Sequence, residues 1–292
     1  MLTLYVIGNG FDLQHHLPTK YTDFKMFVAD RIDDLLNYIM EDMSDESAWN
    51  NFEDVLGKFD SDQYYDDNCL NTDAESWGEA AGVADDIEEM AASLVDLIRE
   101  EFSQWIHAID FGCALPCFEL NIGAMYLSFN YTSTLESVYG IPSNNIKYLH
   151  GKAGGGCDLI FGHGKRVEYE PEQDENGDSN RHMYTDAENA ARIVLASLYK
   201  NVEGIIQRDL NYFRSLSKVS KVIVIGHSLN NIDLPYFREI NKTASGAIWI
   251  VYYYKKDDAE KFMQTLVRDV GIAGQSIKLC HLKPQVRTVI FL

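Results

Sequence analysis

The sequence predicts an α/β fold, with a Rossmann-like parallel sheet, helices on both of its faces and an α-helical insertion. Short runs such as Val222–Ile225 are apolar on both faces, as buried parallel strands are. Stretches with apolar residues at helical spacing separate these runs, and alternation of strands with helices is typical of a parallel sheet. A long acidic stretch after the first run has helical spacing alone, which predicts the insertion.

The elements follow from these patterns in chain order. Apolar runs bounded by turn residues are the expected strands: Leu2–Ile7, Ala124–Phe129, Ile146–Leu149, Leu159–Phe161, Val222–Ile225 and Ala247–Tyr254. Helical spacing is found over residues 24–39, 49–59, 87–106 and 187–216, and the polar residues 165–182 are expected to form a loop. The expected domains are a nucleotide-binding core of residues 1–23 and 113–292, and an acidic helical insertion of residues 24–112.

Composition excludes several classes of function. The 292 residues carry a formal net charge of -20, which repels phosphate backbones and excludes non-specific nucleic-acid binding. No apolar stretch approaches the roughly 20 residues of a membrane span, and the first residues resemble a strand and not a signal peptide, so we expect a cytoplasmic protein without a membrane partner. The five cysteines form no CxxC pair, and no metal is expected.

The first motif follows the first expected strand directly. Its residues are Gly8, Asn9, Gly10, Phe11 and Asp12. Glycine permits a tight turn and lets a phosphate approach the backbone amides, so these residues are candidates for binding a dinucleotide. The third glycine of the dinucleotide fingerprint is absent, and an ordinary strand-to-turn connection is the alternative interpretation.

Two further candidates stand at the ends of the next strands. Asn130 follows the second strand, where ligands of open α/β sheets bind, and its amide can both donate and accept. The alternative is that Asn130 caps a helix over Thr132–Tyr139. His150 follows the third strand and titrates near neutrality, so it is a candidate base. The alternative is a structural histidine under a loop.

The last motif follows the expected strand Val222–Ile225. It contains Gly226, His227, Ser228 and, slightly later, Asp233. A hydrolase nucleophile elbow needs a glycine two residues after the serine, and Asn230 stands there. We therefore expect a helix start whose donors contact a phosphate or a ribose, with a simple strand-to-helix turn as the alternative.

Taken together, these motifs resemble the AbiH abortive-infection family. The segments that carry the resemblance are Ile7–Asp12, Leu17–Tyr21, Phe129–Glu136, His150-Gly151, Gly226–Leu229, Asp233, Tyr236 and Phe237. They cover most of the chain. The resemblance implies a role in defence against phage, a phage-derived trigger and, by analogy with other defence proteins, a homo-oligomer.

The motif order is also similar, more remotely, to sirtuins and sirtuin-like defence NADases. That similarity implies that Asn130 and His150 are the catalytic residues of an NAD⁺ glycohydrolase, with NAD as substrate. It implies that Gly8–Gly10 hold the pyrophosphate and that Gly226–Ser228 contact the adenosine side. Thr132 replaces the sirtuin aspartate, and without a zinc module peptide deacylation is not expected.

Other functions remain as alternatives. The chain could be a non-catalytic sensor that binds NAD or ADP-ribose with the same glycines. A serine hydrolase would use Ser228, His281 and an aspartate, although the elbow glycine is missing. A nuclease is disfavoured by the charge. Glu53 also matches a family position, and a carboxylate on a helix surface is the simpler interpretation.

Overall fold

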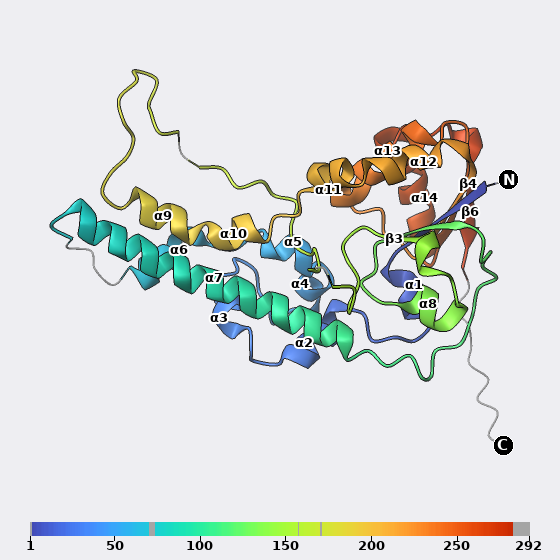
Figure 1. Ribbon diagram of the computed structural model, residues 1–292, viewed down its shortest axis with the longest axis horizontal. Coiled ribbons are helices and arrows are strands. Elements are labelled where there is room, and N and C mark those ends of the chain that lie inside the picture. The colour runs from blue at the N-terminus through green and yellow to red at the C-terminus, as the bar shows by residue number, and fades with distance from the viewer. Residues whose placement is uncertain (1, 70–73, 157, 170, 283–292) are drawn as a thin grey trace. The chain divides into compact units, whose positions relative to one another are not determined.

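The chain folds into two compact units (Figure 1). The computed structural model describes residues 2–69, 74–156, 158–169 and 171–282. The sheet unit contains the described residues of Met1–Lys20, Ile106–Ile160 and Asn201–Leu292, and the helical unit contains those of Tyr21–Trp105 and Phe161–Lys200. The expected insertion of residues 24–112 did not include residues 161–200, which the structure groups with it.

The sheet has six parallel strands. They are β1 (Leu2–Ile7), β2 (Met125–Ser128), β3 (Ile146–Tyr148), β4 (Val219–Ile225), β5 (Ile248–Tyr253) and β6 (Ile277–His281). Their order is β3-β2-β1-β4-β5-β6, and every neighbouring pair is parallel, which confirms the predicted Rossmann-like class. The predicted strand Leu159–Phe161 was wrong, because those residues form no ladder, and β6 was not predicted.

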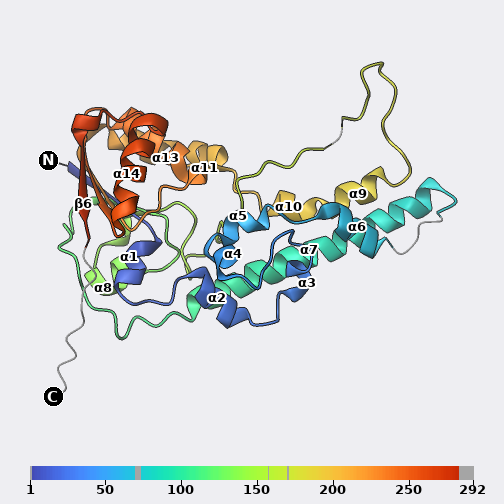
Figure 2. The same cartoon turned by 180° about the vertical axis from the view of Figure 1, so that it is seen from behind.

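Helices cover both faces of this sheet (Figures 1 and 2). The sheet unit contains α1 (Asn9–Gln14), α8 (Thr134–Tyr139), α11 (Val202–Arg208), α12 (Leu210–Ser215), α13 (Leu234–Thr243) and α14 (Lys256–Gln264). It also contains the short turns η1 (Ser143–Asn145), η2 (Leu216–Lys218), η3 (Asn231–Asp233), η4 (Thr265–Asp269) and η5 (Gly274–Ser276). Leu4 and Val6 face a core that includes α11, α13 and α14, whereas Tyr5 and Ile7 face α1 and α8. The alternation of β1 side chains therefore joins two cores.

The helical unit is built around one long helix. Its helices are α2 (Tyr21–Val28), α3 (Asp33–Leu36), α4 (Glu46–Asn50), α5 (Phe52–Leu56), α6 (Ser61–Asn68), α7 (Trp77–His107), α9 (Thr185–Ala191) and α10 (Ile193–Ser197). An aromatic cluster fills its core, with Phe24 in contact with Trp49, Phe52, Phe102 and Trp105. Among the described helices, none combines the length and the apolar character that crossing a bilayer requires.

The strand order determines where a ligand can bind. From β1 the chain adds β2 and β3 on one side of the sheet and then crosses to β4 on the other side, so the strand order changes direction between β1 and β4. Folds of this kind bind nucleotides in the crevice outside the carboxyl ends of these two strands. The expected site residues follow β1, β2, β3 and β4 at that same edge. We refer to the four segments Gly8–Asp12, Phe129–Thr132, Leu149–Gly151 and Gly226–Asp233 as the edge loops.

Candidate functional site

The four edge loops contact one another. The amide of Gly10 donates to the carbonyl of Gly226 at 2.8 Å, which joins the loops after β1 and β4. The ring of Phe129, in the loop after β2, lies 5.6 Å from the His150 ring and 4.4 Å from the His227 ring, measured between centroids. Residues that are far apart in the chain therefore meet along one edge of the sheet.

The glycines of the edge loops are explained by close backbone packing. A Cβ on Gly8 would lie 2.7 Å from the Gly226 carbonyl oxygen, and a Cβ on Gly226 would lie 2.1 Å from the Phe11 nitrogen. The amide of Gly8 donates to Ile225, and that of Phe11 donates to Gly8. The Gly8 and Gly10 amides, which the sequence suggested for a pyrophosphate, thus bind protein carbonyls instead.

His227 is part of the packing beneath the edge. Its side chain is buried, and its Nδ1 accepts from the Leu229 amide at 2.9 Å. This bond places the ring proton on Nε2, which lies 3.5 Å from Asp233 Oδ2. The neighbouring Ser228 is exposed, and His281 Nε2 lies 2.9 Å from the Tyr254 carbonyl oxygen. These contacts give no support to a serine hydrolase site.

Asn130 and His150 lie together at the ends of β2 and β3. The rings of Phe129 and Tyr131, which flank Asn130, both contact the His150 ring. Asn130 is 7% exposed, and its Oδ1 is buried without a hydrogen-bond partner among the described residues. The helix-cap interpretation of Asn130 is wrong, because α8 begins at Thr134 with Ser133 at its N-cap position.

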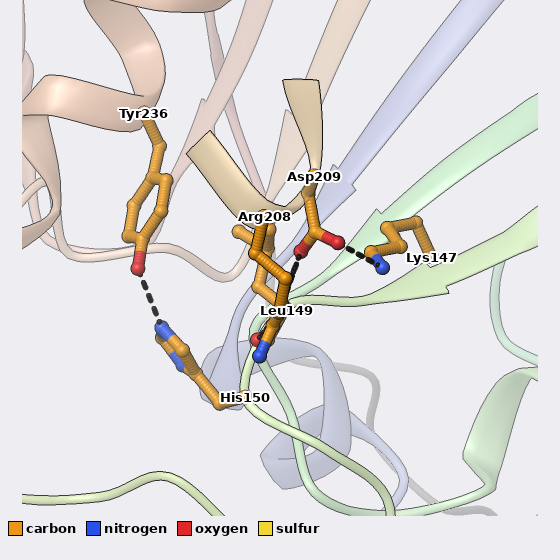
Figure 3. Close-up of polar contacts among 6 residues, drawn as sticks. All are labelled: Lys147, Leu149, His150, Arg208, Asp209 and Tyr236. Atoms are coloured by element: carbon orange, nitrogen blue, oxygen red, sulfur yellow. Dashed lines mark hydrogen bonds and ion pairs between the residues drawn. The ribbon is translucent and has the colours of Figure 1, made fainter. Parts of the chain in front are cut away.

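His150 is held from the side of α13. It is 2% exposed, and its Nε2 lies 3.3 Å from the Tyr236 hydroxyl (Figure 3). Phe129 and Tyr131 pack on the same ring, so the imidazole lies in an aromatic environment. The tyrosine hydroxyl and the packed rings fix the orientation of the imidazole, which is what a positioned base requires.

A network of charges supports the backbone next to His150. Arg208 donates to the Leu149 carbonyl at 2.8 Å, and Arg208 also pairs with Asp209 at 2.7 Å (Figure 3). Asp209 in turn pairs with Lys147 of β3 at 2.5 Å. The network thus ties the end of β3 to α11. Sequence reasoning missed it, because nothing in the pattern of the helical stretch 187–216 marks Arg208 and Asp209 as partners of β3.

Asp12 provides a buried carboxyl group at the same edge. It is 1% exposed, and its Oδ2 accepts from the Thr132 hydroxyl at 2.6 Å. Thr132 also shares a hydrogen bond of 2.9 Å with Thr134. Burial raises the pKa of Asp12 to about 6, although hydrogen bonds from Thr132, Thr134 and Asn130 oppose the change. The sequence proposed Asp12 as a ligand contact but gave no sign of its burial.

Replacing Asp12 with asparagine is expected to stabilise the protein at pH 7. The folded pKa of about 6 lies above the reference value of 3.8, so ionisation opposes folding. The contribution of Asp12 to stability is complete below about pH 4 and is lost as the pH rises through about 6. Urea unfolding at pH 4 to 7 should show the Asp12→Asn advantage growing by up to about 3 kcal/mol. An advantage that is the same at every pH would contradict the raised pKa.

The arrangement offers chemistry without a metal-ligand set. Within the described ranges, no group of three or more His, Cys, Asp or Glu side chains is placed to hold a metal ion. What the edge offers is an unpartnered amide oxygen, a fixed imidazole and a buried carboxyl, from Asn130, His150 and Asp12. Such groups can bind hydroxyl donors and accept a proton from water.

Two residues with important contacts in the candidate site could have been identified from the sequence. Phe129 and Tyr236 belong to motifs that the family resemblance already contained, although neither was given a role. Phe129 touches His150, His227 and Tyr236, so it is central to the edge loops. The signal was their place in motifs that carry the family resemblance.

Glu53 belongs to the helical unit and has partners there. The Tyr21 hydroxyl donates to Glu53 Oε1 at 2.5 Å, and Lys200 forms an ion pair with Glu53. Lys200 is buried, and its charge is therefore compensated by this carboxylate. Glu53 is thus the centre of a polar contact that joins α2, α5 and the end of the 161–200 stretch, and is not an isolated carboxylate on a helix surface.

Comparison with known proteins gives one match. The model of a family described as bacteriophage abortive infection AbiH matches residues 4–254. No curated protein and no solved structure matches the chain. The matched range includes all four edge loops and the whole helical unit.

Proposed function

The chain belongs to the bacteriophage abortive infection AbiH family, and from this premise we propose that it acts in phage defence by hydrolysing the nicotinamide–ribose bond of NAD⁺. One observation carries the proposal. Asn130, whose Oδ1 is buried and unpartnered, stands between Phe129 and Tyr131, whose rings both contact the His150 ring, at the edge where a sheet of this strand order binds nucleotides.

The proposed reaction needs few groups. As the bond between C1′ and the nicotinamide nitrogen breaks, its electron pair leaves with nicotinamide and positive charge develops on the ribose. A water oxygen bonds to C1′, and the water gives up a proton. Asn130 Oδ1 accepts a hydrogen bond from that water, and His150 takes the proton. The packed rings of Phe129, Tyr131 and Tyr236 keep other water away from His150.

The remainder of the nucleotide is proposed to lie over the loops after β1 and β4. Asn9 and Ser228 are exposed there, on either side of the point where the strand order reverses. The Gly8, Gly10 and Gly226 backbones support this position by holding the two loops in contact. The net charge of -20 makes such local polar contacts necessary for an anionic substrate.

The purified protein tests the proposal directly. Incubation with NAD⁺ is expected to release nicotinamide and ADP-ribose in equal amounts, which chromatography of the reaction mixture measures. The control is protein inactivated by heat. If NAD⁺ is recovered intact after long incubation, with no nicotinamide formed, the proposed hydrolysis is wrong.

A nucleotide sensor is the second candidate, and one observation favours it. His150 is 2% exposed and is already bonded to Tyr236, as a histidine with a structural role would be. A sensor would bind NAD⁺ or ADP-ribose and leave both intact. Calorimetric binding without nicotinamide release distinguishes this function from hydrolysis.

A further inference from the structure

Two buried acceptor atoms at the edge lack partners. Asp12 Oδ1 and Asn130 Oδ1 are each buried, and neither has a hydrogen-bond partner in the part of the chain that the structure describes. The residues are 1% and 7% exposed, and they follow the neighbouring strands β1 and β2. Buried polar atoms are nearly always hydrogen-bonded, so two such atoms at one edge indicate a site that a ligand completes.

The two residues belong to one polar cluster. The Thr132 hydroxyl donates to Asp12 Oδ2 at 2.6 Å and so fixes the carboxyl group with its other oxygen unpartnered. The Asn130 side chain is close enough to lower the pKa of the Asp12 carboxyl group. Asn130 is fixed in turn, because its backbone amide donates to the Ser128 hydroxyl at 3.2 Å. The acceptors are therefore held in place before a ligand arrives.

The chemistry of the pair selects its ligand. Both atoms are acceptors, so a phosphate, which offers acceptors and negative charge, does not complete them. A group with hydroxyl or amide donors can donate a hydrogen bond to each of the two oxygens. Within a nucleotide, the vicinal hydroxyls of a ribose carry two donors on adjacent carbons. We propose that Asp12 Oδ1 and Asn130 Oδ1 bind the hydroxyls of the ribose that carries nicotinamide; this rests on the proposed function, because it takes the ligand to be NAD⁺ or ADP-ribose. An amide oxygen has two lone pairs, so Asn130 Oδ1 accepts from a ribose hydroxyl as well as from the attacking water.

The assignment makes binding depend on pH. Burial raises the pKa of Asp12 to about 6, so the carboxyl is about nine-tenths ionised at pH 7 and about one-tenth at pH 5. Protonation removes the negative charge of the carboxylate, whose charge-assisted hydrogen bonds from ribose hydroxyls are about twice as strong as those of the neutral acid. Affinity should therefore fall about tenfold from pH 7 to pH 5.

Other titratable groups lie around Asp12, so only the pH dependence that Asp12→Asn abolishes belongs to Asp12 itself. Tyr148 of β3 interacts with the Asp12 charge, and its pKa is raised far above the ordinary value by burial and by Glu136. Glu136 of α8 is paired with Lys152 at 2.8 Å. His15, at the end of α1, has its pKa lowered by burial.

Calorimetry with ADP-ribose tests the proposal, since this nucleotide has the ribose but no bond to be cleaved. Wild-type protein, Asp12→Asn and the control Glu119→Gln are titrated at pH 7 and pH 5. Glu119 is an exposed carboxylate of the sheet unit, so its substitution changes the net charge equally. Wild type and Glu119→Gln are expected to bind about tenfold more weakly at pH 5. Asp12→Asn should bind at least about tenfold more weakly than wild type at pH 7 and show no pH dependence.

Three results would overturn the proposed binding of the ribose hydroxyls by Asp12 and Asn130. They are wild-type affinity of Asp12→Asn at pH 7, retention of the pH dependence by that variant, and absence of ADP-ribose binding by the wild type. Circular dichroism shows whether each variant is folded. Failure of the proposed hydrolysis has a different signature, which is ADP-ribose binding by a wild-type protein that releases no nicotinamide from NAD⁺.

Discussion

Replacing Asn130 or His150 with alanine should lower the rate of nicotinamide release from NAD⁺ by about 10²–10⁴-fold, the usual cost of removing a catalytic group. Asn130 loses the oxygen that we propose for the water, and His150 loses the proton acceptor. Because His150 is packed against Phe129 and Tyr236, its removal also leaves a void, so His150→Gln is the variant that better preserves packing.

The matched control is Ser133→Ala. Ser133 is half-buried and lies three residues after Asn130, at the start of α8, where its hydroxyl shares a hydrogen bond of 2.9 Å with Ser137. This variant is expected to retain the wild-type rate. Circular dichroism should show that the wild type and every variant are folded. Release of nicotinamide at equal rates by wild type and by both alanine variants would remove Asn130 and His150 from the mechanism.

Replacing Gly226 with alanine should cost more than about 4 kcal/mol of the free energy of unfolding. The new Cβ would lie 2.1 Å from the Phe11 nitrogen and 2.5 Å from the Gly10 carbonyl carbon, and both are backbone atoms. Gly226 also has a φ of +72°, in the left-handed region that side chains rarely adopt. Relief would require the β1 and β4 loops to separate, with loss of the bond from Gly10 to Gly226.

Gly140→Ala separates the clash from the backbone strain. Gly140 has a similar φ of +65°, but a Cβ there would have no atom within 4 Å beyond its chain neighbours. Its substitution should cost only about 1 kcal/mol. Urea unfolding of the two variants gives the comparison. If Gly226→Ala fails to yield folded protein while Gly140→Ala is normal, the expectation is also met; equal and small losses would show that the loops adjust.

The sequence predicted the sheet well because parallel strands have a strong signature. Runs such as Val222–Ile225 are apolar on both faces, as the strands of a parallel sheet that is covered on both sides are. The edge strand β6 was not predicted because Lys278 interrupts its apolar residues, so Ile277–His281 is not a continuous apolar run. The wrong strand Leu159–Phe161 is equally apolar, but its carbonyls serve other partners, such as the Tyr131 hydroxyl, which donates to Ile160.

The sequence predicted that the candidate residues lie at one edge of the sheet, but it did not predict their contacts. Strand ends in a parallel sheet share an edge, so the positions of Asn130 and His150 followed from the motifs. Whether the Gly10 amide faces a ligand or a protein carbonyl depends on Gly226, a residue distant in sequence. The burial of Asp12 likewise depends on Thr132 and on packing that no local pattern records.

The pairing of β1 with β4 also determines when the centre of the sheet can form during translation. Ile7 lies opposite Ile225, so the first strand to leave the ribosome waits roughly ten to forty seconds for its central neighbour at ordinary elongation rates. Both segments of the helical unit have been synthesised once translation reaches Lys200, which is before β4 begins. A nascent chain at this stage therefore contains the edge loops after β1, β2 and β3 but lacks the loop after β4. The candidate nucleotide site is therefore complete only after translation has passed Asp233.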